Sequence, residues 1–269
     1  MTLPVSIDSV GAACAHVLRT PEPHAKLMAA RAAARDWRLG RIAHRFDTAM
    51  PDRPARPDAP ELLLPAQMPR RGKMGSDRAR IAMLHAIAHI EFVAIDLAFD
   101  LVGRFGGEFP RAFTDQWMQV GAEEAMHFAL LDRRLRQLGS HYGALPAHDG
   151  LWQAAEETAA DALARLAIVP MVLEARALDI TPATVERFET IGDLTSARML
   201  RRRMHDEMRH VSAGTTWFNW ATNRQGLDSP NHYQMLVKRH FRGSVKPPFN
   251  DSARRQAGLT EEFYVALAT

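Results

Sequence analysis

The chain lacks several features that would place it in a common class of protein. Its 269 residues include one cysteine, Cys14, which excludes an internal disulfide and favours a reducing compartment. No uninterrupted apolar run reaches the roughly 18 residues that suggest a membrane span. The opening residues Met1-Thr2-Leu3-Pro4 do not form a basic and then apolar leader. We therefore expect a cytoplasmic protein without a membrane partner.

Further absences narrow the chemistry. The sequence shows no alternating strand pattern and no glycine-rich nucleotide loop. The net charge of +3 is too small to indicate nucleic acid by itself. The stretch 232–255 nevertheless carries an excess of positive charge. It contains one acidic residue, Asp251, and six basic residues, Lys238, Arg239, Arg242, Lys246, Arg254 and Arg255. This surplus suits a phosphate-bearing substrate, although an ordinary solvated surface is the favoured interpretation.

Helical periodicity, by contrast, is abundant. Long helices are predicted over about 76–105, 110–138, 151–179 and 194–222, and shorter ones over about 8–18, 22–37, 181–190 and within 229–269, with a break at Pro247-Pro248. Pro170 should kink or open the third long helix. Prolines between residues 50 and 75 predict an extended segment that ends in the basic Arg70-Arg71-Gly72-Lys73.

A repeated motif gives two of the long helices a chemical role. Glu207 and His210 are three residues apart, which places both side chains on one face of a helix. Glu124 and His127 repeat this spacing in an earlier helix. A carboxylate and an imidazole one turn apart can hold one metal ion, although a single Glu-x-x-His is a weak signal.

One further glutamate precedes each motif at the same distance. Glu91 lies 33 positions before Glu124 (124 − 91), and Glu174 lies 33 positions before Glu207 (207 − 174). These side chains fall on apolar stripes, where an isolated charge is costly to bury; the alternative is a protonated or salt-bridged core glutamate. Ferritin-type bundles bind a metal pair with this inventory. The candidate metal ligands are therefore Glu91, Glu124, His127, Glu174, Glu207 and His210.

These observations predict an all-α protein built on a ferritin-like four-helix bundle with a di-metal site. We expect N-terminal helices and a proline-rich wrap over residues 1–75, the bundle over 76–222, and a C-terminal helical extension over 223–269. Carboxylates and imidazoles without thiolate suit two Fe ions, with Mn or a mixed Mn/Fe pair as alternatives.

Residues around the ligands are expected to support them. Ligating histidines usually donate their second ring N–H to a carboxylate, and Glu123 and Asp206 immediately precede the motif glutamates. Arg209 would tie this outer layer together. His85 and His89 are rotated from Glu91 by about 120° and about 160°, so a structural or supporting role is expected for them, with metal ligation or contact with substrate as the alternatives.

The motif Asp206-Glu207-Met208-Arg209-His210 resembles that of the di-iron carboxylate oxygenases and ribonucleotide reductase small subunits of the ferritin-like superfamily. More narrowly, the segments 84–91, 170–176 and 205–210 resemble a bacterial ferritin-like family called domain of unknown function 455. The resemblance implies the fold and the metal site but no substrate. It also makes Arg176 a candidate for facing substrate or supporting the ligands. The first motif departs from the pattern, with Glu123 for Asp and Met126 where Arg would stand.

The leading functional hypothesis is an oxidoreductase that activates O2 to hydroxylate or oxidise a substrate, with an external electron donor. By analogy, the phosphate-bearing substrates to consider include a modified nucleotide in tRNA. The oligomeric state to consider is a homodimer. The alternatives are metal storage and a helical scaffold with a structural metal site. A radical-generating subunit is disfavoured because Tyr142, Tyr233 and Tyr264 all lie more than a helical turn along the chain from the ligands.

Overall fold

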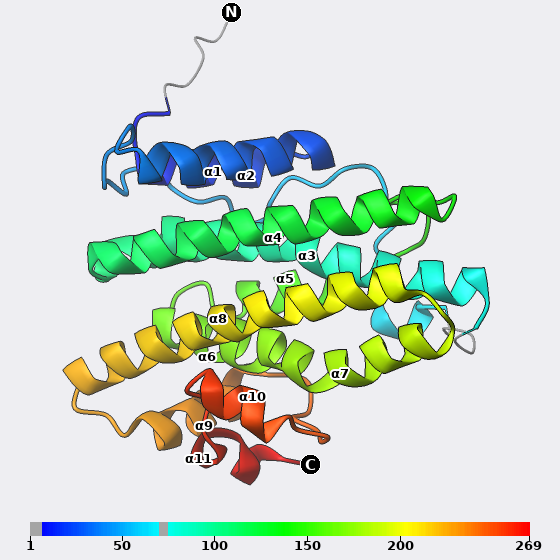
Figure 1. Ribbon diagram of the computed structural model, residues 1–269. Coiled ribbons are helices and arrows are strands. Elements are labelled where there is room, and N and C mark those ends of the chain that lie inside the picture. Colours follow the sequence, from blue (N-terminus) through cyan, green and yellow to red (C-terminus); the bar gives the residue numbers. More distant parts are fainter. Residues whose placement is uncertain (1–6, 70–74) are drawn as a thin grey trace, which may run out of the picture. The chain divides into compact units, whose positions relative to one another are not determined.

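The computed structural model describes residues 7–69 and 75–269, so Met1 to Pro4 and Arg70 to Lys73 lie outside the described residues. Within that part the chain is all-helical, with isolated β-bridges and no strand (Figure 1). This confirms the predicted helical class.

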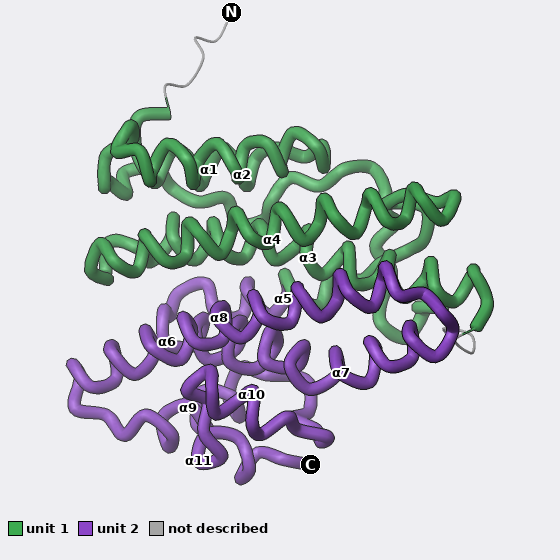
Figure 2. Tube along the Cα trace, viewed as in Figure 1, with its two compact units in different colours: residues 1–152 green, residues 153–269 purple. Residues whose placement is uncertain are grey.

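The chain divides into two compact units, residues 1–152 and 153–269 (Figure 2). Unit 1 contains α1 (Val10–Arg19), α2 (Pro23–Arg38), η1 (Pro65–Gln67), α3 (Asp77–Phe105), η2 (Gly106–Glu108) and α4 (Arg111–Gln137). Helix α5 (Gly150–Glu156) includes the point of division. Unit 2 contains α6 (Ala162–Ile168), η3 (Val169–Glu174), α7 (Ala175–Thr190), α8 (Leu194–Arg224), α9 (Ser229–His240), α10 (Asp251–Gln256), α11 (Glu261–Tyr264) and η4 (Val265–Leu267). The predicted boundaries near residues 75 and 222 differ from this division, and the three-part organisation stays a prediction.

Unit 1 is built around the helix pair α3 and α4. The short turn η2 returns the chain alongside α3, and α1 and α2 pack on this pair, α1 against α3 and α2 against α4 (Figure 1). Ser76 begins α3 as its N-cap, with its hydroxyl accepting a hydrogen bond from the Ala79 amide at 3.2 Å. The predicted bounds of the two long helices are therefore confirmed to within a residue or two.

A buried ionic cluster joins the extended segment, α2 and α3 within unit 1. The Asp96 carboxylate, fully buried on α3, pairs with the ammonium of Lys26 on α2 and with the guanidinium of Arg56. Burial lowers the pKa of Lys26, and the attraction of Asp96 opposes that shift. Removing one partner of such a pair is strongly destabilising, so the cluster fixes the proline-rich segment on α3.

Helix α3 is also apolar enough to be a membrane-span candidate. The stretch Asp77–Glu108 contains an 18-residue window of mean hydropathy 1.7. Of that window, 67% is buried, and the core helix of a helical protein passes the same test. Packing against α1 and α4 accounts for the apolar side chains.

Unit 2 corrects the prediction of one continuous third helix over 151–179 that is disturbed only at Pro170. The chain instead breaks at 157–161, and α6 then passes through the π-helical η3 into α7. Asp161 caps α6 by accepting from the Ala164 amide at 3.0 Å. The buried Arg165 donates back to Thr158 Oγ1 at 2.9 Å and to the Ala155 carbonyl at 2.6 Å, which stabilises the break. The predicted short helix from Thr181 is part of α7.

The rest of unit 2 follows the prediction. Helix α8 packs along α6, η3 and α7, while α9 packs on α6, and the two short terminal helices α10 and α11 follow the Pro247-Pro248 break. Asp193 caps α8 through a hydrogen bond from the Ser196 amide at 3.0 Å.

Candidate metal centre

Three of the predicted ligands meet on the inner face of α3 and α4 in unit 1. Glu91 comes from α3, and Glu124 and His127 come from α4; all three side chains are buried. His127 Nδ1 lies 3.1 Å from Glu91 Oε2 and 3.4 Å from Glu124 Oε2. One donor atom from each residue falls within 4.8 Å of the others, so this cluster could hold a metal ion. We call it the unit 1 triad.

A close approach of the two helices brings the unit 1 triad together. Gly121, one turn before Glu124, faces the Phe99 ring of α3, and a Cβ built at Gly121 would lie 2.5 Å from Phe99 Cε2. Glycine therefore lets α4 sit against α3 at this level, where a larger residue would displace the ring.

The other three predicted ligands meet within unit 2. Glu174 ends η3, and Glu207 and His210 lie one turn apart on α8. One donor atom from each again lies within 4.8 Å of the others, and His210 Nδ1 is 3.9 Å from Glu207 Oε2. Glu207 and His210 are buried, while Glu174 is half-buried. This unit 2 triad could also hold a metal ion.

The unit 2 triad depends on an irregular helix. Pro170 cannot donate the backbone hydrogen bond of a regular turn, and η3 is π-helical from Val169 to Glu174, as the expected opening of the helix predicted. Gly214 of α8 lies directly against it, and a Cβ there would be 2.5 Å from Pro170 Cβ. Without a side chain at Gly214, α8 reaches η3, and the π turn sets the position of Glu174.

The residues expected to support the ligands have other partners in the structure. Asp206 Oδ1 pairs with Arg209 at 2.8 Å. Glu123 accepts a hydrogen bond from Gln119 at 3.0 Å. The bonds expected from Glu123 and Asp206 to the histidines stay a prediction.

Sequence reasoning missed Arg203. Its guanidinium lies 2.8 Å from Glu207 Oε1, and both side chains are buried. The i, i+4 spacing of Arg203 and Glu207 on one helix was the available signal.

His85 and His89 anchor the loop that follows α4. His89 Nδ1 lies 2.9 Å from the Tyr142 hydroxyl, and its Nε2 lies 3.2 Å from the His148 carbonyl. His85 Nε2 accepts from the Gly143 amide at 2.9 Å. Burial lowers the pKa of His85 to about 4 and that of His89 to about 3, so both rings are neutral at neutral pH. The structural role that the sequence favoured fits these contacts.

Arg176 contacts the C-terminal segment of unit 2. Its Nη1 donates to the carbonyls of Lys246 at 2.7 Å and Pro248 at 3.1 Å, and lies 3.4 Å from Asp179 Oδ2. A role beside the metal ligands or substrate stays a prediction for this residue.

The donor set defines the chemistry that each triad can perform. Two carboxylates and one imidazole, without thiolate, suit first-row metals such as iron and manganese. Cys14 lies elsewhere, buried on α1, and burial raises the pKa of its thiol. The residues of both triads could therefore hold a metal ion.

Comparison with known proteins identifies the family. Residues 19–265 match a family described as "Protein of unknown function (DUF455)". A Haemophilus influenzae protein described as "Uncharacterized protein" is 38% identical over 211 residues, which are 76% of this chain and 73% of that protein. No solved structure matches the chain. The chain belongs to the DUF455 family, as its resemblance predicted.

Proposed function

We propose that this member of the DUF455 family is a ferritin-like oxidoreductase, which holds two metal ions and activates O2 to hydroxylate or oxidise a substrate. The observation that supports the proposal most strongly is the duplicated ligand set. Each unit contributes two glutamates and one histidine in the same chain order, with the isolated glutamate 33 positions before the motif. Ferritin-type bundles combine two such sets in one metal pair.

The ligand chemistry favours iron, with manganese or a mixed pair as the alternatives. When bound, such metals supply the one-electron and O2 chemistry that side chains lack. Nδ1 of His127 and Nδ1 of His210 each face a carboxylate of their own triad, so we assign these atoms as the metal-binding nitrogens. Arg203 positions the Glu207 carboxylate through its 2.8 Å contact, and burial of every ligand except Glu174 limits access of water.

The proposal requires partners that the chain itself does not provide. An external reductant must supply electrons, and the substrate is a small molecule, for which a phosphate-bearing compound is one candidate class. A modified tRNA nucleotide belongs to that class by analogy alone. We assign the protein to the cytoplasm, with a homodimer as the assembly to test.

Metal content tests the proposal directly. The protein is loaded anaerobically with Fe(II), desalted, and analysed for iron per chain. The variants are Glu91→Ala, Glu207→Ala and the control Glu186→Ala, which removes an exposed glutamate of α7. We expect about two irons per chain in the parent and the control, clearly less in both ligand variants, and a new near-ultraviolet absorption band when O2 is admitted.

The other outcomes identify the alternatives. Many irons per chain in a shell-like assembly would replace an oxidoreductase with a storage protein. Bound metal that neither changes its spectrum nor consumes O2 with a reductant would indicate a structural site. A folded parent protein that binds no metal would overturn the proposal.

A further inference from the structure

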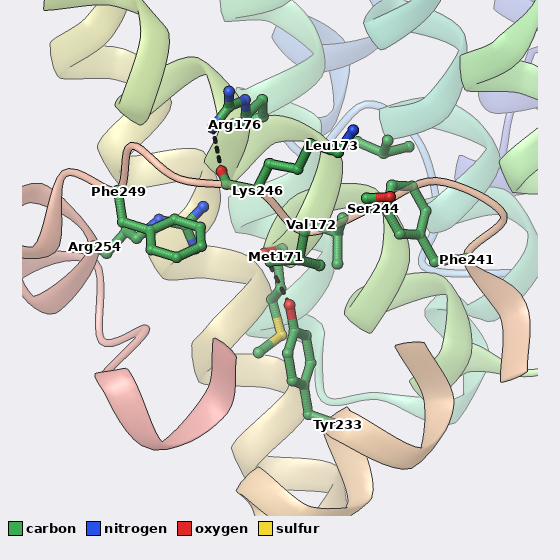
Figure 3. Close-up of a pocket in the computed structure, with 11 residues that line it drawn as sticks. Met171, Val172, Leu173, Arg176, Tyr233, Phe241, Ser244, Lys246, Phe249 and Arg254 are labelled. Carbon is green, nitrogen blue, oxygen red and sulfur yellow. Dashed lines mark hydrogen bonds between the residues drawn. The ribbon is translucent and has the colours of Figure 1, made fainter. Parts of the chain in front are cut away.

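Unit 2 contains a cavity of about 120 Å³ that the metal ligands do not line. Its walls come from η3, α7, α9, the segment between α9 and α10, and Arg254 of α10 (Figure 3). The residues that matter for its chemistry are Val172, Leu173, Arg176, Tyr233, Phe241, Ser244, Lys246 and Phe249. It therefore combines apolar walls with three cationic side chains, those of Arg176, Lys246 and Arg254, and the hydroxyl of Ser244.

Arg176 presents an incompletely used guanidinium to this cavity. The carbonyls of Lys246 and Pro248 and the Asp179 carboxylate all contact one nitrogen, Nη1. Figure 3 shows the bond from Arg176 to the Lys246 carbonyl. Its Nε and Nη2 make no hydrogen bond to any residue of the described chain. These two nitrogens form the edge of the guanidinium that binds a carboxylate through two parallel hydrogen bonds.

Two more polar groups of the cavity are similarly available. Within the described part of the chain, the Lys246 ammonium has no ion pair and the Ser244 hydroxyl has no hydrogen bond. Both belong to the segment between α9 and α10, as Figure 3 shows, while Arg176 belongs to α7. Donors from two different elements thus line one cavity, with Ser244 and Lys246 at its exposed side.

The nearby acid does not neutralise this charge. Asp179 is held by Arg254, with Arg254 Nε 2.8 Å from Oδ1 and Arg254 Nη2 2.7 Å from Oδ2. The Asn250 amide also donates to Asp179 Oδ1 at 3.0 Å. The positive charges of Arg176 and Lys246 therefore remain in excess at the cavity, which favours an anion.

The walls and the volume restrict what kind of anion fits. Val172, Leu173, Phe241 and Phe249 supply apolar surface. Tyr233 uses its hydroxyl to donate to the Met171 carbonyl at 3.2 Å, so only its ring is offered to a ligand. An apolar cavity of about 150 Å³ accepts benzene, so this cavity suits a hydrocarbon body of roughly four to six carbon atoms.

We propose that this cavity is a binding site for a short-chain carboxylate, with the carboxylate on Arg176, Lys246 and Ser244 and the hydrocarbon part against Val172 and Phe249. The inference does not depend on the metal proposal, because every residue that it uses lies outside the two triads. A ligand that bridges Arg176 and Lys246 joins α7 to the C-terminal segment and should stabilise unit 2.

Binding is measured by isothermal titration and by thermal unfolding of the full chain. The probes are isovalerate, its neutral amide, the cation isoamylamine and inorganic phosphate. We expect saturable binding of isovalerate, a rise in Tm, and at least about tenfold weaker binding of the amide, which loses a charge-assisted contact. Isoamylamine should not bind.

Variants locate the site. Lys246→Met should weaken isovalerate binding by about tenfold, because it removes one charged partner. The matched control Lys238→Met removes an exposed cation of α9 that does not line the cavity and should leave affinity unchanged. Arg176→Lys keeps the charge but loses the two-pronged edge, and it should also weaken binding.

Three outcomes would overturn the proposal. The first is an equal effect of Lys246→Met and Lys238→Met, which would indicate general electrostatic attraction. The second is equal binding of the acid and its amide. The third is tighter binding of phosphate than of isovalerate, which would show that the apolar walls do not select the ligand. Because the metal content of Lys246→Met is measured in the same preparation, failure here is distinguishable from failure of the metal proposal.

Discussion

The two triads contain the same residue types but are built differently. In unit 1 the ligands lie on two regular helices, and His127 Nδ1 is within 3.4 Å of both carboxylates. In unit 2 one ligand, the half-buried Glu174, ends a π-helical segment, and His210 Nδ1 is 3.9 Å from Glu207. Regular helices fix side-chain positions, whereas π segments are frequent at functional sites. The comparison suggests a preformed unit 1 triad and an adjustable unit 2 triad.

The largest expected effect tests the ion pair found in unit 2. Arg203→Met should lower the free energy of unfolding of the metal-free protein by about 3–5 kcal/mol, because Glu207 then loses a buried cationic partner. Urea denaturation measures this, with the exposed Arg202→Met as the control. If metal binds the unit 2 triad, Fe(II) should recover part of the loss. A loss below about 1 kcal/mol would show that the pair contributes little.

Acid should destabilise unit 1 through its loop histidines. The folded state holds the pKa of His89 at about 3, and that of His85 at about 4, whereas the unfolded chain titrates near the ordinary 6.5. The unfolded chain therefore binds more protons below pH 6.5, and stability falls as the pH decreases toward the folded values. Each histidine should contribute roughly 2 kcal/mol of loss between pH 6.5 and pH 5.

Denaturation as a function of pH measures this loss, and His89→Gln should reduce the slope between pH 6.5 and pH 5. Hydrogen exchange should locate the weakening at residues 139–149. An unchanged slope in His89→Gln would contradict the assignment, whatever the absolute stability of the variant.

Replacing one glycine in each unit by alanine tests how tightly the helices are packed beside each triad. In Gly121→Ala the new methyl group meets the Phe99 ring, which can rotate, so a loss of about 1 kcal/mol is expected. In Gly214→Ala it meets Pro170, whose ring is fixed to the backbone, and about 2 kcal/mol is expected. Thermal and urea unfolding measure both. A larger effect at Gly121 would show that the Phe99 ring cannot move away from the new methyl group.

The smallest effects concern the outer carboxylates. Asp206→Asn disrupts a pair with Arg209, whose side chain is 55% exposed, so stability should change by less than about 1 kcal/mol. Glu123→Gln should change stability even less. Iron affinity is measured in both variants as well. A loss of tenfold or more in either one would establish that the replaced carboxylate bonds to a ligating histidine.

The regular helices were predictable because their signals are local. Ser76 and Asp193 cap α3 and α8 where the sequence places them, and apolar periodicity gives their lengths. The break after α5 was missed, although Thr158 and Asp161 are suitable capping residues, because an alanine-rich periodic stretch continues across it. The break is stabilised by hydrogen bonds from the buried Arg165, which apolar periodicity does not reveal.

The ligand candidates were recognisable for the same reason. Spacing three apart on a helix is a local property, and Glu91 and Glu174 were identified by their polarity on apolar stripes. The partners of the supporting residues depended on tertiary contacts. His89 meets Tyr142 from a loop 53 positions away, and Asp96 meets Lys26 at a separation of 70.

The sequence by itself determined the helical class, three of the four long helices and the identity of the six candidate ligands, because helix geometry converts spacing into a shared face. Tertiary structure decided which atoms of those ligands face one another, the π turn that carries Glu174, and the placement of Arg203 against Glu207. It also created the cavity at Arg176 from segments about 70 residues apart. Such arrangements depend on packing between distant segments, which local periodicity does not specify.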